Sequence, residues 1–287
     1  MYNKTMKLPN GVSIPVLALG TWRIKDDNVS EPVKEALKLG YRHIDTAQVY
    51  GNERGVGEAV KNCGIDRKEL FITSKVAAEH KTYEEAALGI ENTLKTMGLD
   101  YLDMMLIHSP QPWKEVNQSE DRHIEGNRNA WKALEDAYES GKLRAIGISN
   151  FLREDIDSLW EAARIKPMVN QILCHISNTP FELIEYCKSK GIVVEAYSPI
   201  AHGEAMKNET ILKMAKKYGV SIPRLCIRYD IQLGTVVLAK AANPEHIKDN
   251  SDLDFVISDE DMEILKNVEK IKDYGEHGFL PVFGGKL

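Results

Sequence analysis

The strongest constraint on the fold is a repeat in which a short apolar run is followed by a helix-like segment. The run occurs eight times, at residues 15–21, 42–47, 70–76, 102–108, 144–150, 167–173, 192–198 and 235–240. Runs that are apolar on both faces are typical of parallel strands covered on both sides. The repeat therefore predicts an α/β protein with a parallel sheet.

Between the runs, apolar residues recur at spacings of three and four, which predicts amphipathic helices. The clearest segments are 30–40, 82–98, 127–142 and 181–191. Each of these segments ends at or next to a glycine, the residue that most readily takes the left-handed conformation of a helix C-cap: Gly40, Gly98, Gly141 and Gly191.

Eight such units predict a (β/α)8 TIM barrel, and the proline and glycine of the first residues predict a short β-hairpin ahead of the first barrel strand. An open, doubly wound sheet is the alternative. No linker rich in proline, glycine or serine divides the 287 residues. We therefore expect residues 1–287 to form a single barrel domain.

Composition excludes several classes of function. A formal net charge of −6 argues against a nucleic-acid binder, and no apolar run is long enough to cross a membrane. The 4 cysteines form no C-x-x-C pair and no metal-like cluster. The sequence predicts a cytoplasmic protein with buried free thiols, no metal site and no membrane contact.

Polar residues stand where the apolar runs end, and in a barrel of this type the active site forms at those strand ends. Singly, each has a structural interpretation, such as a helix cap for Asp45, rim packing for Lys75 and His108, or core packing for Tyr50. Their joint occurrence favours a site. The set at or near the strand ends is Asp45, Lys75, His108, Ser149, Asn150, Gln171, Tyr197, Ser198 and Lys240.

Asp45, Tyr50, Lys75 and His108 make a plausible proton-transfer set. A free tyrosine, with a pKa of about 10, is a poor acid at neutral pH, and a lysine cation held by Asp45 is expected to lower that pKa. His108 would polarise a carbonyl oxygen, and Tyr50 would donate a proton to it. The set has no hydrolytic nucleophile, so it needs an external reductant, for which a nicotinamide hydride is the natural candidate.

Six motifs, in order along the chain, resemble the aldo-keto reductase family. They are "GYRHIDTAQVYGNE" at 40–53, "FITSKV" at 71–76, "LIHSP" at 106–110, "GISNF" at 147–151, "VNQ" at 169–171 and "AYSP" at 196–199. The short C-terminal segment is most similar to compact microbial members of the diketogluconate and methylglyoxal reductase type. The resemblance implies a catalytic tetrad of Asp45, Tyr50, Lys75 and His108, with Tyr50 as the general acid.

The resemblance also implies NADPH as cofactor and assigns residues to it. Ser149, Asn150 and Gln171 would hold the carboxamide of nicotinamide, and Tyr197 would stack on the ring. The other implied cofactor residues are those at the floor of the site and beside the pyrophosphate: Gly20, Thr21, Trp22, Asp45, Ser198, Pro199 and Ile200.

The segment implied to hold the adenosine phosphate, "LAKAANPEHIKDN" at 238–250, departs from the family pattern. Lys240, Asp249 and Asn250 match, whereas Ala241 replaces a serine and His246 replaces an arginine. Histidine cannot bind a phosphate through two charged hydrogen bonds of fixed geometry, as arginine does. We therefore expect NADPH to be preferred, with better tolerance of NADH than in a typical relative.

The substrate end also departs from the family, because Ala77 and Ser109 stand where many relatives carry tryptophan. A wider, wetter mouth is expected, with Tyr50 and His108 at its base. Its walls would be Trp22, Val49 and either Trp113 or the loop 111–126. The partner is predicted to be a small-molecule carbonyl compound, bulkier or more polar than usual, and the chain a monomer or a weak homodimer. The continuation "SPIAHGEA" at 198–205 departs from the family as well.

Two other functions are compatible with a barrel of this type. One is a nicotinamide-binding regulatory subunit with little turnover, and the other is a Schiff-base lyase that uses Lys75. Tyr50 and the amide set argue against the lyase. The "GVG" at 55–57 superficially resembles a dinucleotide fingerprint, but the preceding strand ends eight residues too early. We expect these glycines to let a helix approach the barrel.

Overall fold

The centre of the molecule is a closed barrel of eight parallel strands, as predicted. The computed structural model describes residues 4–116, 118–278 and 282. The barrel strands are β3 (Leu17–Gly20), β4 (His43–Asp45), β5 (Phe71–Val76), β6 (Met104–Ile107), β7 (Ile146–Ser149), β8 (Val169–Leu173), β9 (Val193–Tyr197) and β10 (Val236–Lys240). Because β10 pairs with β3, the sheet has no open edge, and the doubly wound alternative is wrong.

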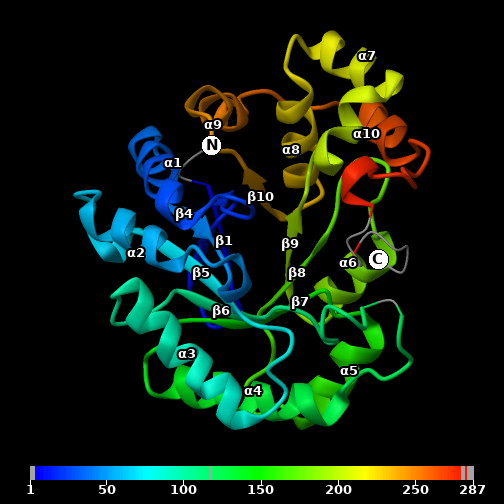
Figure 1. Cartoon of the computed structure of the whole chain (residues 1–287). Helices are drawn as coiled ribbons and strands as arrows, with labels where there is room; N and C mark the ends of the chain where they lie inside the picture. Colours follow the sequence, from blue (N-terminus) through cyan, green and yellow to red (C-terminus); the bar gives the residue numbers. More distant parts are fainter. Residues whose placement is uncertain (1–3, 117, 279–281, 283–287) are drawn as a thin grey trace.

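Ahead of the barrel, β1 (Thr5–Lys7) and β2 (Ser13–Pro15) form the predicted antiparallel hairpin. The α-helices surround the barrel (Figure 1). They are α1 (Asp26–Leu39), α2 (Glu53–Asn62), α3 (Tyr83–Met97), α4 (Ile124–Glu139), α5 (Arg153–Ala162), α6 (Phe181–Ser189), α7 (Glu209–Tyr218), α8 (Ile222–Gln232), α9 (Pro244–Ser251) and α10 (Asp259–Lys266). Gly40 and Gly98 are C-caps with φ of 106° and 63°, as predicted.

The strand residues are almost all buried on both faces, which explains the continuous apolar runs. In register, Gly20 lies beside Asp45, and Ser149 lies beside Gln171. All eight strands are parallel, so their polar C-terminal residues emerge at one end of the barrel.

The glycines of the "GVG" stretch do not face the barrel, so the expectation about their packing is wrong. A Cβ atom on Gly55 would lie 2.3 Å from the carbonyl oxygen of Asp26, at the start of α1. A Cβ atom on Gly57 would lie 2.2 Å from the carbonyl oxygen of Met97, at the end of α3. These glycines let α2 fit closely between its two neighbouring helices, because backbone approaches backbone there.

The replacement Gly57→Ala is therefore expected to destabilise the fold by about 3 kcal/mol, the upper part of the usual range for overpacking. The obstacle is backbone at the end of α3, which cannot rotate away as a side chain would. Equilibrium unfolding in urea measures the change. An unfolding midpoint equal to that of the parent would contradict the close packing of α2 on α3.

Among the described residues, no helix combines the length and the apolar character needed to cross a membrane. The cysteines Cys63, Cys174, Cys187 and Cys226 are free thiols. The last three are buried, whereas Cys63 is partly exposed.

Candidate active site

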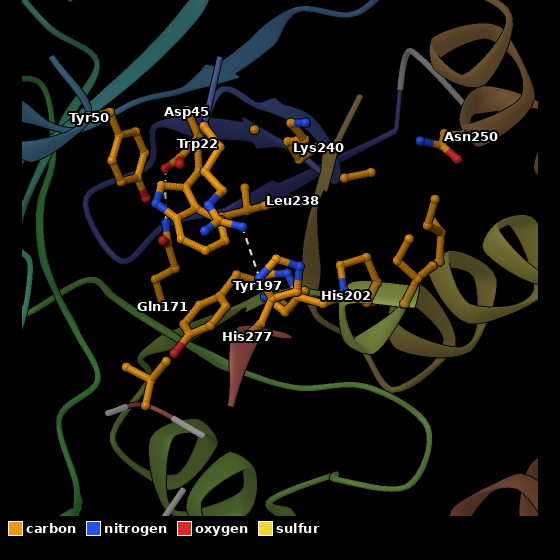
Figure 2. A pocket seen from close by; sticks show the side chains of 18 of the residues that line it. Trp22, Asp45, Tyr50, Gln171, Tyr197, His202, Leu238, Lys240, Asn250 and His277 are labelled. Carbon is orange, nitrogen blue, oxygen red and sulfur yellow. Dashed lines mark hydrogen bonds between the residues drawn. The ribbon is translucent and has the colours of Figure 1, made fainter. Parts of the chain in front are cut away.

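A cavity of about 710 Å³ lies at the C-terminal ends of the strands (Figure 2). It brings together most of the residues that the sequence nominated from separate strand ends and loops. The nominated residues that line it are Gly20, Trp22, Asp45, Val49, Tyr50, His108, Ser149, Asn150, Gln171, Tyr197, Ser198, Pro199, Ile200, Lys240, His246, Asp249 and Asn250.

Four nominated residues do not line the cavity: Lys75, which is completely buried, and Thr21, Ala77 and Ser109, whose assignment is thereby corrected. Thr21 is fully buried, and its hydroxyl donates to the carbonyl oxygen of Asp45 at 3.0 Å. The Ala77 backbone N–H donates to the side chain of Gln48 at 2.8 Å, and Ser109 is fully buried beneath the mouth. These residues therefore shape the site from behind.

The expected loss of aromatic wall at the mouth is partly compensated. Trp113, from the loop that follows β6, lines the cavity and approaches the His108 ring edge-on, with ring centroids 4.9 Å apart. Trp113 therefore supplies an indole at the mouth, from a different position in the chain than Ala77 and Ser109. Residue 117 of the same loop lies outside the described residues.

The centre of the site is a buried ion pair beneath a tyrosine. Lys75 is completely buried and donates to Asp45 Oδ1 at 2.6 Å and to the carbonyl oxygen of Thr46 at 2.8 Å. Its ammonium nitrogen lies 5.1 Å from the centroid of the Tyr50 ring. The rings of Tyr50 and His108 meet edge to face at 5.6 Å. The four residues proposed from the sequence are therefore neighbours.

A short turn holds Tyr50 over this pair. The turn is the 3-10 helix η1 (Gln48–Tyr50), which ends at Gly51 with φ of 65°. Gln48 binds the backbone of Ala77 and donates to Thr93 at 3.1 Å, which ties the turn to β5 and α3. Gln48 was not predicted from the sequence, although its polarity beside Tyr50 in the "AQVY" stretch was a usable signal.

Asn52 anchors the other end of the same turn. Its side-chain oxygen accepts from the Thr46 hydroxyl at 2.6 Å, and its amide nitrogen donates to the carbonyl oxygens of Thr21 at 3.0 Å and Ile24 at 2.9 Å. Asn52 is fully buried. It too was missed, and its role could be found only once the loops after β3 and β4 were seen side by side.

The charge states follow from burial and from the Lys75–Asp45 contact. Burial alone disfavours the Lys75 ammonium, but Asp45, Tyr50 and Glu195 together raise the pKa of Lys75 above its usual value. Burial and the Lys75 cation lower the pKa of His108 well below its usual value, so His108 is neutral at neutral pH.

The expectation for Tyr50 needs correction. Burial raises the pKa of the Tyr50 hydroxyl, and Lys75 opposes that rise without overcoming it. The reason is that the hydroxyl leaves water as well as approaching a cation, and desolvation penalises the phenolate. Tyr50 is therefore protonated at neutral pH, and the Lys75 cation is the neighbouring group that favours its phenolate form.

Glu195, which was not predicted from the sequence, lies inside the barrel below the tetrad. The Gln171 amide nitrogen bridges the two acids by donating to Asp45 Oδ2 at 3.0 Å and to Glu195 Oε2 at 2.9 Å. Burial, with the nearby Asp45 charge, raises the pKa of Glu195 to about 8. A charged residue within the apolar run 192–198 was the signal that could have identified it.

The inner end of the cavity suits a planar ring that carries an amide. Tyr197 donates to Asn150 Oδ1 at 2.7 Å, and Asn150 in turn donates to the carbonyl oxygen of His108 at 3.0 Å. Within the described part of the chain, nothing donates to Gln171 Oε1, so this acceptor is available to a bound amide. The nominated carboxamide residues thus present a ring and polar groups together.

The outer end of the cavity suits an adenosine phosphate less completely. Lys240 and His246 are exposed there, next to the first turns of α9, whereas Asp249 accepts from Ser221 at 2.5 Å. Ala241 is buried and offers no hydroxyl. Lys240 supplies one positive charge, but His246 cannot bind a phosphate through two charged hydrogen bonds, as an arginine at that position would.

The family model described as "Aldo/keto reductase family" matches residues 16–270. A glyoxal reductase of Bacillus subtilis (strain 168) is 41% identical over 273 residues, which is 94% of this chain and 95% of that protein. An aldehyde reductase of Saccharomyces cerevisiae is 41% identical over 93% of this chain and 91% of its own. The structure of a Bombyx mori aldo-keto reductase in complex with NADP superposes with a TM-score of 0.83 at 32% identity, covering 93% of each chain.

Proposed function

The chain belongs to the aldo/keto reductase family, and from this premise we propose that it is an NADPH-dependent oxidoreductase that reduces aldehyde or ketone carbonyls to alcohols. The observation that carries the proposal is the buried Lys75–Asp45 pair beneath Tyr50, at the inner end of a cavity that continues to Lys240. This arrangement joins a proton donor to a cavity of about 710 Å³ that reaches Lys240.

The cofactor, when bound, supplies a hydride to the carbonyl carbon. The protein's own residues act on the carbonyl oxygen of the substrate. Neutral His108 donates a hydrogen bond to the carbonyl oxygen, and Tyr50 delivers its hydroxyl proton as that oxygen gains negative charge. The Lys75 ammonium then stabilises the Tyr50 phenolate, and Asp45 keeps Lys75 protonated and in place. Gln171, Ser149 and Asn150 orient the amide of the ring.

The state of Lys75 favours a reductase over a Schiff-base lyase. A lysine that attacks a carbonyl must lose its proton, which enzymes achieve by lowering its pKa. Here the pKa of Lys75 is raised, and its nitrogen already donates to Asp45 and to the Thr46 carbonyl. Tyr50 is the more accessible of the two groups, because Lys75 is completely buried.

The inner end of the cavity supports a small-molecule carbonyl substrate, with Trp22, Val49 and Trp113 as walls. Glyoxal and aldehydes are the substrates named for two of the relatives, so dicarbonyls and aldehydes are the first compounds to test. The purified protein is mixed with NADPH and each compound, and nicotinamide absorbance is followed. Steady turnover supports the proposal, whereas slow, single-turnover oxidation of bound NADPH would support a regulatory subunit. A cytoplasmic location and a monomeric or weakly dimeric state remain part of the proposal.

The replacement His246→Arg is expected to tighten NADPH binding about tenfold and to leave NADH binding nearly unchanged. A guanidinium can meet the 2′-phosphate with two charged hydrogen bonds, which His246 cannot. Fluorescence titration of the parent and the variant with both cofactors measures the effect. In the parent, NADPH is expected to bind more tightly than NADH, and equal affinities would show that the phosphate selectivity has been lost. An equal gain for both cofactors in the variant would contradict the assignment of His246.

A further inference from the structure

A glutamate lies inside the barrel at a position where an apolar residue would suit the fold. Glu195 stands in β9 between Val194 and Ala196, and its side chain is completely buried. In strand register it lies directly beside Gln171 of β8, which lines the cavity. Burying a carboxyl group costs free energy unless the group is well hydrogen-bonded. The hydrogen bonds of Glu195 therefore show whether the fold compensates that cost.

The hydrogen bonding of Glu195 is incomplete. Its Oε2 atom accepts from the Gln171 amide nitrogen at 2.9 Å, whereas its Oε1 atom is buried and has no hydrogen-bond partner within the described part of the chain. His43 Nε2 is 3.8 Å from Oε1, but it lies closer, at 3.0 Å, to the Thr73 hydroxyl. Burial lowers the pKa of His43 to about 3, so the ring is neutral and forms no ion pair with Glu195. The hydrogen bond to Gln171 is thus the contact that holds the carboxyl group.

Packing gives no reason for a carboxyl group at this position. Replacing a buried charged group by an apolar side chain of similar volume is often neutral or stabilising. Glu195 is also not one of the described residues that line the cavity, so it does not touch a molecule bound there. Any effect of Glu195 on the site must therefore pass through Gln171.

The amide of Gln171 is held by two acids at once. Its nitrogen donates one hydrogen to Asp45 Oδ2 at 3.0 Å and the other to Glu195 Oε2 at 2.9 Å. In Figure 2 the Gln171 side chain points toward Asp45. Because an amide group is planar, two hydrogen bonds from its nitrogen fix the plane and the side on which the oxygen lies. A single bond to Asp45 would leave the amide free to turn about that bond.

We propose that Glu195 is a positioning residue that fixes the amide plane of Gln171, so that Gln171 Oε1 is held ready to accept from the carboxamide N–H of bound nicotinamide. The proposal rests on the proposed function, because it presumes a bound nicotinamide cofactor. It adds a residue that acts on the cofactor without touching it. Holding the acceptor in place before binding avoids the cost of ordering it during binding.

The acceptor oxygen of Glu195, and not its charge, is what this role requires. Burial, with the nearby Asp45 charge, raises the pKa of Glu195 to about 8, so the group is largely protonated at pH 7. A protonated carboxyl group still carries an oxygen that accepts from the Gln171 nitrogen. A glutamine at this position also offers such an oxygen, and Glu195→Gln is therefore the conservative variant that should preserve the role.

The test compares two ligands that differ at the carboxamide. NADP⁺ carries an amide N–H, whereas its acetylpyridine analogue has an acetyl group there and cannot donate. Quenching of tryptophan fluorescence in the full-length protein gives both dissociation constants at pH 7. The parent is expected to bind NADP⁺ about tenfold more tightly than the analogue, the effect of one hydrogen bond to an acceptor that would otherwise stay unpaired.

The variants separate the role of the acceptor from that of the fold. Glu195→Met removes the acceptor at similar length, and the preference for NADP⁺ is expected to fall to about twofold or less. Glu195→Ala removes the same acceptor and replaces Glu195→Met if that variant does not fold. Glu195→Gln is expected to keep the parent's preference. Asp230→Leu is the matched control, because Asp230 is another completely buried acid, is bonded to Cys174 and does not line the cavity.

A general loss of structure would weaken both ligands together and leave the preference unchanged. An unchanged preference in Glu195→Met or Glu195→Ala, even with a lower unfolding midpoint in urea, would therefore overturn the role of Glu195. Loss of the preference in Glu195→Gln or in Asp230→Leu would overturn it as well. Equal binding of the two ligands by the parent would overturn the inference and leave NADPH-dependent reduction standing, whereas absence of NADP⁺ binding would overturn the proposed function too.

Discussion

Replacing Tyr50 with phenylalanine is expected to lower kcat by about 10² to 10⁴-fold, the usual contribution of a general acid, while NADPH binding stays within about twofold of the parent. The ring of Tyr50 remains to cover Lys75 at 5.1 Å, so the variant removes a hydroxyl and little else. The alkoxide that forms at the carbonyl oxygen then lacks its proton donor, since neutral His108 offers a hydrogen bond and Lys75 is buried.

Stopped-flow transfer of hydride and steady-state turnover, both followed by nicotinamide absorbance, measure the loss. Tyr83→Phe is the matched control, because it removes a phenol hydroxyl that donates to Asp136 on the surface, and Tyr83 does not line the cavity. That variant is expected to keep the parent's kcat. Full activity in Tyr50→Phe would remove Tyr50 from the role of proton donor and would reopen the question of which group supplies the proton.

Replacing Lys75 with methionine is expected to cost about 3–5 kcal/mol of unfolding free energy and to abolish turnover. Asp45 is nearly buried, at 3% exposure, and its Oδ1 atom loses the 2.6 Å partner that balances its charge. The Gln171 amide still donates to the other oxygen, but a neutral amide cannot neutralise a buried carboxylate. Removing one member of a buried pair costs more than the pair contributes.

Chemical denaturation of the single variant and of the double variant Asp45→Asn/Lys75→Met distinguishes the buried charge from lost packing. The double variant is expected to regain a large part of the stability, because no uncompensated charge remains. Lys142→Met is the control for a surface pair, since Lys142 and Glu91 are both exposed and such pairs contribute little. If Lys75→Met were no less stable than Lys142→Met, the buried pair would not be the electrostatic centre that the geometry indicates.

Much of the architecture could be predicted from the chain. The eight apolar runs and the glycine-ended helices required only the periodicity of hydrophobic residues, and the closed barrel and its N-terminal hairpin are confirmed. The tetrad could also be nominated, because its members stand at strand ends, which parallel strands bring to one face. The family was correctly identified from six ordered motifs.

Other residues were wrongly nominated as cavity residues, because a position at a strand end does not determine which way a side chain points. Thr21, Ala77 and Ser109 stand at strand ends, but their side chains or backbone groups bond within the walls and leave the cavity to others. Trp113, by contrast, was one of the two walls offered by the sequence, and it does line the cavity. Gly55 and Gly57 meet the backbone of neighbouring helices, a contact that depends on how α2 sits between them.

The sequence by itself determined the barrel and the order of its units, and it nominated the polar residues at the strand ends, since these follow from local periodicity and residue type. The tertiary structure alone decided which side chains face the cavity and that Glu195 sits beneath Asp45. It also decided the pKa of Tyr50, which burial raises and Lys75 lowers. The physical reason is that desolvation and charge interactions depend on distances between segments remote in sequence, which no local pattern encodes.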